Sequence, residues 1–330
     1  IEINQKMPHA IRIHQTGPAS VLKWESTETP RPQKGEVLIR HTAIGLNFID
    51  TYHRKGLYPL PTPFTPGLEG AGYIEDTGSR VINVKIGDRV AYCSDPIGAY
   101  SETRLYPANR VIKIPREISD EKAASMMLKG LTAAMLLRRI YRPKPGEPVL
   151  IHAAAGGVGL ILCQWAKFLG ATVIGTVSSA KKAAIAKKHG CDHAIVYTER
   201  NFKDRVRTIT KGLGVPVVYD GVGKATHLGS LDSLKPRGMW ITFGNASGPV
   251  PPIAPLTLSQ KGSLFMTRPI LNHYISTEKE LATLSRELFS VVRRGGVKIV
   301  INQRYKLKEA GKAHRDLEKR KTVGSTVLIP

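Results

Sequence analysis

The chain has 330 residues, of which 42% are apolar, and a formal net charge of +23 at pH 7. This length and apolar content suffice for two domains with a core each, and they exclude a largely disordered chain. One long uncharged run, residues 148–166, holds a proline, a histidine and three glycines. A membrane span is therefore not expected there.

The three cysteines, Cys93, Cys163 and Cys191, are an odd number and have no paired spacing. This usage indicates a reducing compartment without a disulfide framework. No basic-then-apolar leader precedes the first domain, so we expect a cytoplasmic protein. A trimmed organelle-targeting segment is the alternative, because the sequence begins at Ile1 rather than Met.

Residues 1–124 have the pattern of a β-rich domain with irregular loops. Short runs rich in β-branched and aromatic residues alternate with proline and glycine clusters such as 58–67. These runs are residues 11–14, 37–43, 70–75, 89–92, 99–105 and 110–114.

From Ser119 onward the pattern changes to alternating helices and strands. A helix is predicted over 123–139, followed by a strand at 149–151 and a turn that contains Gly156, Gly157 and Gly159. Helix-spaced apolar residues then run from Leu160 to Leu169, and a second β-branched run covers 172–177. This βαβ unit places its glycine turn where a pyrophosphate would lie on backbone N–H groups at a helix start.

The charge around this unit predicts the cofactor. NAD sites carry an acidic residue about 20 residues past the glycines, where it accepts from the ribose 2′-hydroxyl. Here no acidic residue occurs between Glu147 and Asp192, and Ser178, Lys181 and Lys182 stand in that region. Hydroxyl and ammonium groups attract a 2′-phosphate, so NADPH is the expected cofactor. We assign the phosphate contact to Lys182, and interpret Lys181 as a solvated residue.

Further strand and helix units complete a doubly wound parallel sheet, so the chain is of the α/β class. We place this nucleotide-binding domain at 125–270, and expect part of 271–330 to return to the first domain. The predicted elements are strands at 193–197, 215–220, 238–243, 297–304 and 325–329, and helices at 202–210, 225–234, 277–294 and 307–319.

The positive charge is unevenly distributed. Lysines and arginines exceed acidic residues by 2 in 1–124, by 14 in 125–270 and by 7 in 271–330. A polyanionic cofactor explains only part of this excess. Weak binding of RNA or single-stranded nucleic acid is one interpretation, and a generally basic surface is the other.

Several motifs in order along the chain resemble the medium-chain dehydrogenase/reductase superfamily, and within it the zinc-independent NADPH:quinone oxidoreductases that include zeta-crystallin. The resemblance covers nearly the whole length, and implies a GroES-like, mostly β catalytic domain beside a Rossmann domain. The motifs lie at residues 45–52, 66–72, 98–100, 128–132, 152–167, 218–220, 243–245, 267–269 and 324–330.

The zinc-dependent members of this superfamily have Cys at the position of Asn47 and His at the position of Leu68. Asparagine and leucine cannot complete the Cys/His set of a catalytic zinc, so no metal is expected. His189, Cys191 and His193 are close in sequence, but they lie where a helix ends and a strand begins, and we do not interpret them as ligands.

The resemblance also implies the site residues. Asn47, Asp50, Tyr52 and Thr132 are implied to be catalytic. Tyr52 is the one proton donor among them, with a wall or gate residue as the equal alternative. The cofactor would be held by Phe48, Tyr52, Thr132, Gly156, Gly157, Val158, Ser178, Lys182, Tyr197, Gly221, Phe243, Asn245, Arg268 and Arg320.

The resulting hypothesis is an NADPH-dependent quinone reductase that acts without metal. The alternatives are an NADPH-dependent enone or enal double-bond reductase, and a nucleic-acid-binding or crystallin-type role on the same fold. A homodimer is implied, joined by edge strands near 263–267. The physiological acceptor, and whether one or two electrons move in each step, stay open.

Overall fold

The computed structural model describes residues 7–28 and 30–330, and its contacts divide the chain into two units. The β-rich unit comprises residues up to Lys129 together with Thr277–Ser285 and Ile301–Pro330, and the Rossmann unit comprises Gly130–Ser276 and Arg286–Val300. The boundary predicted from the sequence, at 124, lies five residues before this one. In the described part of the chain, no helix combines the length and apolar character needed to cross a membrane.

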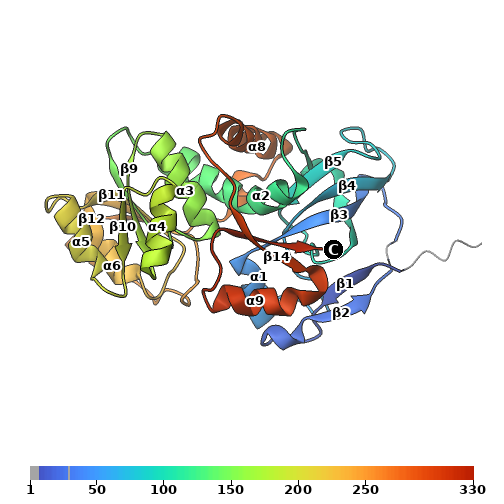
Figure 1. Ribbon diagram of the computed structural model, residues 1–330, viewed down its shortest axis with the longest axis horizontal. Coiled ribbons are helices and arrows are strands. Elements are labelled where there is room, and N and C mark those ends of the chain that lie inside the picture. Colours follow the sequence, from blue (N-terminus) through green and yellow to red (C-terminus); the bar gives the residue numbers. More distant parts are fainter. Residues whose placement is uncertain (1–6, 29) are drawn as a thin grey trace, which may run out of the picture. The chain divides into compact units, whose positions relative to one another are not determined.

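The β-rich unit is built on a seven-stranded sheet, in which six strands follow in the order β14-β15-β3-β4-β5-β7 and the seventh, β6, pairs with β3. Figure 1 labels four of these strands, β3, β4, β5 and β14. Two strands that precede this sheet in the chain, β1 and β2, form a separate antiparallel pair. Its strands are β1 (His9–Arg12), β2 (Lys23–Ser26), β3 (Glu36–Leu46), β4 (Glu69–Thr77), β5 (Arg89–Cys93), β6 (Thr103–Pro107), β7 (Ile112–Lys113), β14 (Ile301–Lys306) and β15 (Ser325–Ile329).

The central strand β3 alternates buried and half-buried residues in its first half, as a strand with one face on a core does. Val37, Ile39 and Ile44 of β3 pack into a cluster with Tyr92, Tyr100 and Leu328. The tail therefore returns to this unit, because β15 pairs antiparallel with β3. The helices that lie wholly in the β-rich unit are α1 (Phe48–Lys55) and α9 (Ala310–Glu318), with short 3-10 turns at Ala19–Val21, Ala108–Arg110 and Leu307–Glu309.

The Rossmann unit has six parallel strands in the order β10-β9-β8-β11-β12-β13. Numbered by chain position this is the order 3-2-1-4-5-6 of a dinucleotide-binding sheet, and it confirms the doubly wound prediction. The strands are β8 (Pro148–Ile151), β9 (Thr172–Val177), β10 (His193–Val196), β11 (Val215–Asp220), β12 (Leu234–Thr242) and β13 (Phe265–Thr267).

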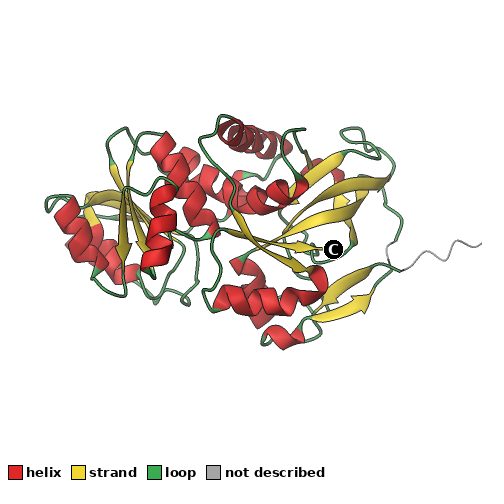
Figure 2. Ribbon diagram, in the orientation of Figure 1, coloured by secondary structure: helices red, strands yellow, loops and turns green. Residues whose placement is uncertain are grey.

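Helices cover both faces of this sheet (Figure 2). They are α3 (Gly157–Phe168), α4 (Ala180–Lys188), α5 (Phe202–Ile209), α6 (His227–Ser233) and α7 (Pro255–Gln260), with a 3-10 turn at Leu271–Tyr274. Leu150, Ile174, Val218 and Trp240 form the centre of the core on one side of the strands. Two further helices, α2 (Asp120–Met135) and α8 (Glu278–Arg293), contribute residues to both units.

Most elements agree with the expectation, and the differences have local reasons. The helix predicted over 123–139 ends as α2 at Met135 and continues as one π-helical turn, Leu136–Ile140. No helix is predicted at α1, because the helix is too short for a clear apolar periodicity and a proline-rich run follows it. None is predicted at α7 either, because this helix begins at the end of another proline-rich run.

Candidate functional site

The expected cofactor residues of the Rossmann unit gather at one edge of the parallel sheet. Because parallel strands end at the same edge, residues that follow the six strands lie along it, and this is where such sheets bind ligands. Those residues are Gly156 after β8, Ser178 after β9, Tyr197 after β10, Gly221 after β11, Phe243 after β12 and Arg268 after β13.

The glycine turn after β8 has a backbone that tolerates few side chains. Ala153 adopts a φ of 52°, and its carbonyl oxygen accepts from the Gly156 N–H at 2.8 Å. A Cβ on Gly159 would lie 2.1 Å from that same oxygen, so only glycine fits there. Gly156 is the N-cap of α3, and the first N–H groups of the helix, including those of Gly157 and Val158, are the ones without an intrahelical partner. The turn thus has the features of an anion site at a helix start.

The edge beside β9 and β10 carries the residues expected to contact the adenosine half. Val196 of β10 is in register with Val177 of β9, and the Tyr197 N–H donates to the Val177 carbonyl at 3.1 Å. Tyr197 and Ser178 therefore leave the sheet side by side. Ser179 caps α4 by accepting from the Lys182 N–H, which places Lys182 in the first turn of that helix, half-buried, whereas Lys181 is exposed.

A buried carboxylate that the sequence analysis places in a family motif, but not among the site residues, organises the loop after β11. Asp220 accepts hydrogen bonds from the hydroxyls of Thr226 and Ser230, from the Trp240 indole N–H, and from two backbone N–H groups of the loop. The ring of Phe243 packs against Gly221, where a Cβ would lie 3.0 Å from it. The sequence signal for this residue is its position, because Asp220 ends an apolar strand and is followed directly by Gly-Val-Gly.

Thr132, Asn245 and Arg320 are the remaining expected residues, and of these Asn245 lies at the same sheet edge as Arg268. Thr132 is half-buried in α2, and Asn245 is half-buried in the loop after β12. Arg268 is exposed after β13. Arg320 belongs to the β-rich unit, where it follows α9 with a φ of 58°.

In the β-rich unit the expected catalytic residues lie on α1, directly after β3. Asn47 is the N-cap residue, and its N–H donates to Asp50 Oδ2 at 2.9 Å. The Tyr52 ring is buried, with Tyr58 edge-on at 5.4 Å and Phe48 tilted at 6.1 Å between centroids. Burial raises the pKa of Asp50 to about 7, opposed by the hydrogen bonds from the Asn47 backbone and Tyr100. Asp50 therefore changes its charge near neutral pH.

Glu69, the second residue missed as a site residue, is wholly buried next to Asn47. Its carboxylate accepts from Asn47 Nδ2 at 2.8 Å, from the Leu128 N–H at 2.8 Å and from Lys129 Nζ at 3.2 Å. A Cβ on Gly45 would lie 2.2 Å from this carboxylate, which explains the glycine in β3. A glutamate and a lysine within otherwise apolar runs were the available signal.

This arrangement does not fit a catalytic zinc ion. Asn47 presents its amide N–H to Glu69, Leu68 has no donor atom, and the cation beside the carboxylate is the ammonium of Lys129. Within 7–28 and 30–330, no three His, Cys, Asp or Glu side chains are grouped in a way that could hold a metal ion.

Comparisons with known proteins agree with this fold. Residues 33–116 match the family described as alcohol dehydrogenase GroES-like domain, and residues 157–303 match the family described as zinc-binding dehydrogenase. A quinone oxidoreductase of Pseudomonas aeruginosa is 50% identical, covering 98% of this chain and all of the relative. A 2-haloacrylate reductase of a Burkholderia species is 46% identical over 98% of this chain and 99% of its own length. The crystal structure of Escherichia coli quinone oxidoreductase complexed with NADPH superimposes with a TM-score of 0.96 at 47% identity, covering 98% and 100% of the two chains.

Proposed function

The chain belongs to the zeta-crystallin-like quinone oxidoreductases of the medium-chain dehydrogenase/reductase superfamily, and from this premise we propose that it reduces a quinone with NADPH and without metal. The observation that carries the proposal is the carboxyl edge of the Rossmann sheet, where a glycine turn, hydroxyls and Lys182 take the place of an acidic ribose contact. When bound, NADPH supplies the hydride.

The acceptor follows from the chemistry around Asn47. With no ion to polarise a carbonyl, the substrate itself must accept a hydride readily. A quinone does so because its reduction gives an aromatic quinol. We assign Asn47, Asp50, Tyr52 and Thr132 to the surroundings of the reacting ring, and Phe48, Phe243, Asn245, Arg268 and Arg320 to the nicotinamide half of the cofactor.

A conjugated double bond is the competing acceptor, and one observation favours it. The Burkholderia relative is named for a 2-haloacrylate, an alkene conjugated to a carboxyl group. Reduction of such an alkene needs a proton placed at carbon, whereas a quinolate takes its protons from water. Tyr52 is the residue at which the two reactions differ.

Tyr52→Phe tests this difference. Turnover of a quinone should change only a few fold. Turnover of an enone should fall on the order of 100-fold if Tyr52 protonates carbon, because a positioned general acid contributes about that much. Both rates are followed by the loss of NADPH absorbance, with NADPH affinity measured in parallel.

The matched control is Tyr73→Phe, which removes a hydroxyl from an exposed ring on β4. A large loss confined to the enone would replace the quinone proposal with a double-bond reductase. Wild-type protein that turns over neither class of acceptor would refute both.

We also propose that two copies pair through β13. This strand ends the sheet order, and its side chains Phe265 and Met266 are 57% and 46% exposed. An exposed apolar strand at a sheet edge presents unpaired backbone groups, and pairing with a second copy across a two-fold axis would satisfy them.

Light scattering at micromolar concentration should therefore give the mass of a dimer. Phe265→Asp should shift this mass toward the monomer, because it buries a charge at the proposed interface. Leu213→Asp, at a site that is 72% exposed elsewhere in the same unit, should leave it unchanged. A monomeric wild-type protein would contradict the proposal.

A further inference from the structure

A continuous series of hydrogen bonds in the β-rich unit joins α9 to the start of α1. Arg54 Nη1 lies 3.0 Å from His314 Nδ1, His314 Nε2 lies 3.0 Å from the Tyr100 hydroxyl, and this hydroxyl lies 2.9 Å from Asp50 Oδ2. All four side chains are at most 1% exposed. Water therefore does not compete for these bonds.

The direction of every bond in the series follows from its first member. A guanidinium can only donate, so His314 must accept at Nδ1, and its single ring proton is on Nε2. Nε2–H then donates to the Tyr100 oxygen, which leaves the Tyr100 proton to be donated to Asp50. Burial and the nearby Arg54 lower the pKa of His314 to about 3, so the imidazole stays neutral and this tautomer is retained.

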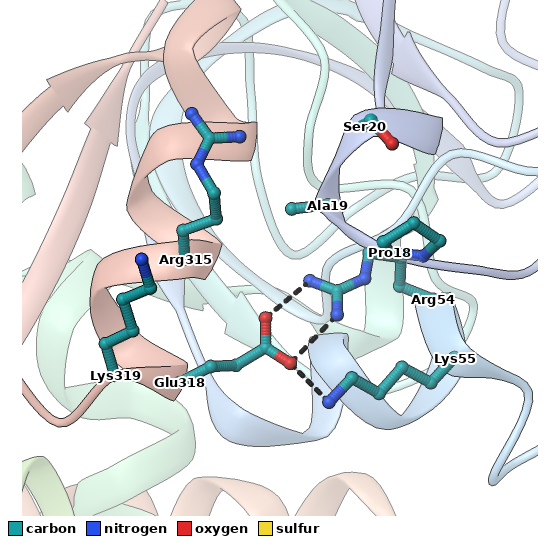
Figure 3. Close-up of a pocket in the computed structure, with 8 residues that line it drawn as sticks. All are labelled: Pro18, Ala19, Ser20, Arg54, Lys55, Arg315, Glu318 and Lys319. Atoms are coloured by element: carbon teal, nitrogen blue, oxygen red, sulfur yellow. Dashed lines mark hydrogen bonds and ion pairs between the residues drawn. The ribbon is translucent and has the colours of Figure 1, made fainter.

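The outer end of the series is fixed by a salt bridge at a shallow pocket between α1 and α9 (Figure 3). Arg54 donates through both terminal nitrogens to Glu318, at 3.1 and 2.9 Å, and Lys55 pairs with the same carboxylate at 2.5 Å. Arg54 Nε donates to the Gly17 carbonyl at 3.0 Å. The guanidinium is thus held in one orientation.

At the inner end, the two oxygens of Asp50 differ. Oδ2 accepts from Tyr100 and from the Asn47 N–H, whereas no donor among the described residues reaches Oδ1. We propose that Arg54, His314 and Tyr100 are positioning residues whose one-way hydrogen bonds keep Oδ2 an acceptor and direct the exchangeable proton of Asp50 to Oδ1. Protonation at Oδ2 would displace two donors at once.

This inference deepens the proposed function and rests on it in one respect, the placement of Asp50 near the reacting ring. Hydride transfer adds negative charge to a quinone, so an ionised Asp50 opposes it and a neutral one does not. Lys129 and Tyr100 favour the carboxylate, and burial and Glu69 oppose it. Because the pKa of Asp50 is about 7, kcat should fall as the pH rises through neutrality.

The test is the titration of Asp50 itself. It is monitored through the carboxyl infrared or carbon NMR signals of the whole protein without substrate. Tyr100→Phe removes a bond donated to the carboxylate, so the titration should move upward by about one pH unit, since a bond to a charged group is worth about that much. The fall in kcat for a quinone should move in the same direction. Tyr106→Phe is the matched control, because it removes an equally buried hydroxyl in the same unit, whose hydrogen bonds among the described residues go to Ser94 and Asp95.

Two substitutions at His314 keep the test decisive where Tyr100→Phe does not fold. Glutamine can accept from Arg54 and donate to Tyr100, so His314→Gln should titrate like the wild type, whereas His314→Leu should titrate at higher pH. Equal titration in His314→Gln and His314→Leu, or no difference between Tyr100→Phe and Tyr106→Phe, would overturn the inference. A protein that reduces no quinone yet shows these shifts would refute the proposed function alone.

Discussion

Replacing Glu69 with glutamine is expected to lower the free energy of unfolding by about 3–5 kcal/mol, the usual effect of removing one partner of a buried ion pair. Glu69 is wholly buried and Lys129 nearly so, and their charged atoms are 3.2 Å apart. Glutamine keeps the shape of the side chain and one acceptor oxygen. The loss therefore arises from the ammonium of Lys129, which is left without a counter-charge in a site that excludes water.

Urea unfolding measures this effect, and a double variant separates charge from packing. Glu69→Gln combined with Lys129→Met removes both charges and should recover most of the stability, because well-packed apolar replacements of buried pairs are often neutral. Glu75→Gln is the control on the same strand, β4, since its pair with Arg40 is about one-third exposed and such pairs contribute about 0–1 kcal/mol. No recovery in the double variant would show that the hydrogen bonds to Asn47 and Leu128 matter more than the charge.

The Rossmann unit could be predicted because its determinants are local. The glycine turn at Gly156, the apolar strands and the helix spacing all lie within one βαβ unit, and the strand order then follows from the handedness of the connections. Placement of Ser178, Tyr197 and Gly221 at one edge needed no further information. Parallel strands bring their ends together whatever the intervening sequence.

The β-rich unit was less predictable because its determinants are distant along the chain. Arg54 and Glu318 are 264 residues apart, and Tyr100 and His314 are 214 residues apart. A lone buried histidine or arginine has no periodic signature, so no window of sequence contains this series of hydrogen bonds. Glu69 and Lys129 illustrate the same limit, since the sequence places each in a motif but does not show that the two side chains form a pair.

Lys182→Ala is expected to weaken NADPH binding by about 1–3 kcal/mol, which is roughly a 5- to 150-fold increase in Kd, and to leave NADH nearly unchanged. The two cofactors differ only by the 2′-phosphate, so an ammonium that contacts this phosphate affects one of them. Lys182 lies in the first turn of α4, beside Ser178 and the end of β9. Calorimetric titration of both cofactors measures the difference.

The neighbouring Lys181 provides the matched control, because Lys181→Ala removes the same charge one residue away from an exposed position. A general loss of positive potential would weaken NADPH binding in both variants to a similar degree, and raising the salt concentration would remove the effect in both. A direct contact predicts a loss specific to Lys182. Equal losses for NADPH and NADH in Lys182→Ala would refute the assignment, since the side chain would then serve the helix or the shared part of the cofactor. In that case the preference for NADPH would have to come from Ser178 and from the absence of a carboxylate between Glu147 and Asp192.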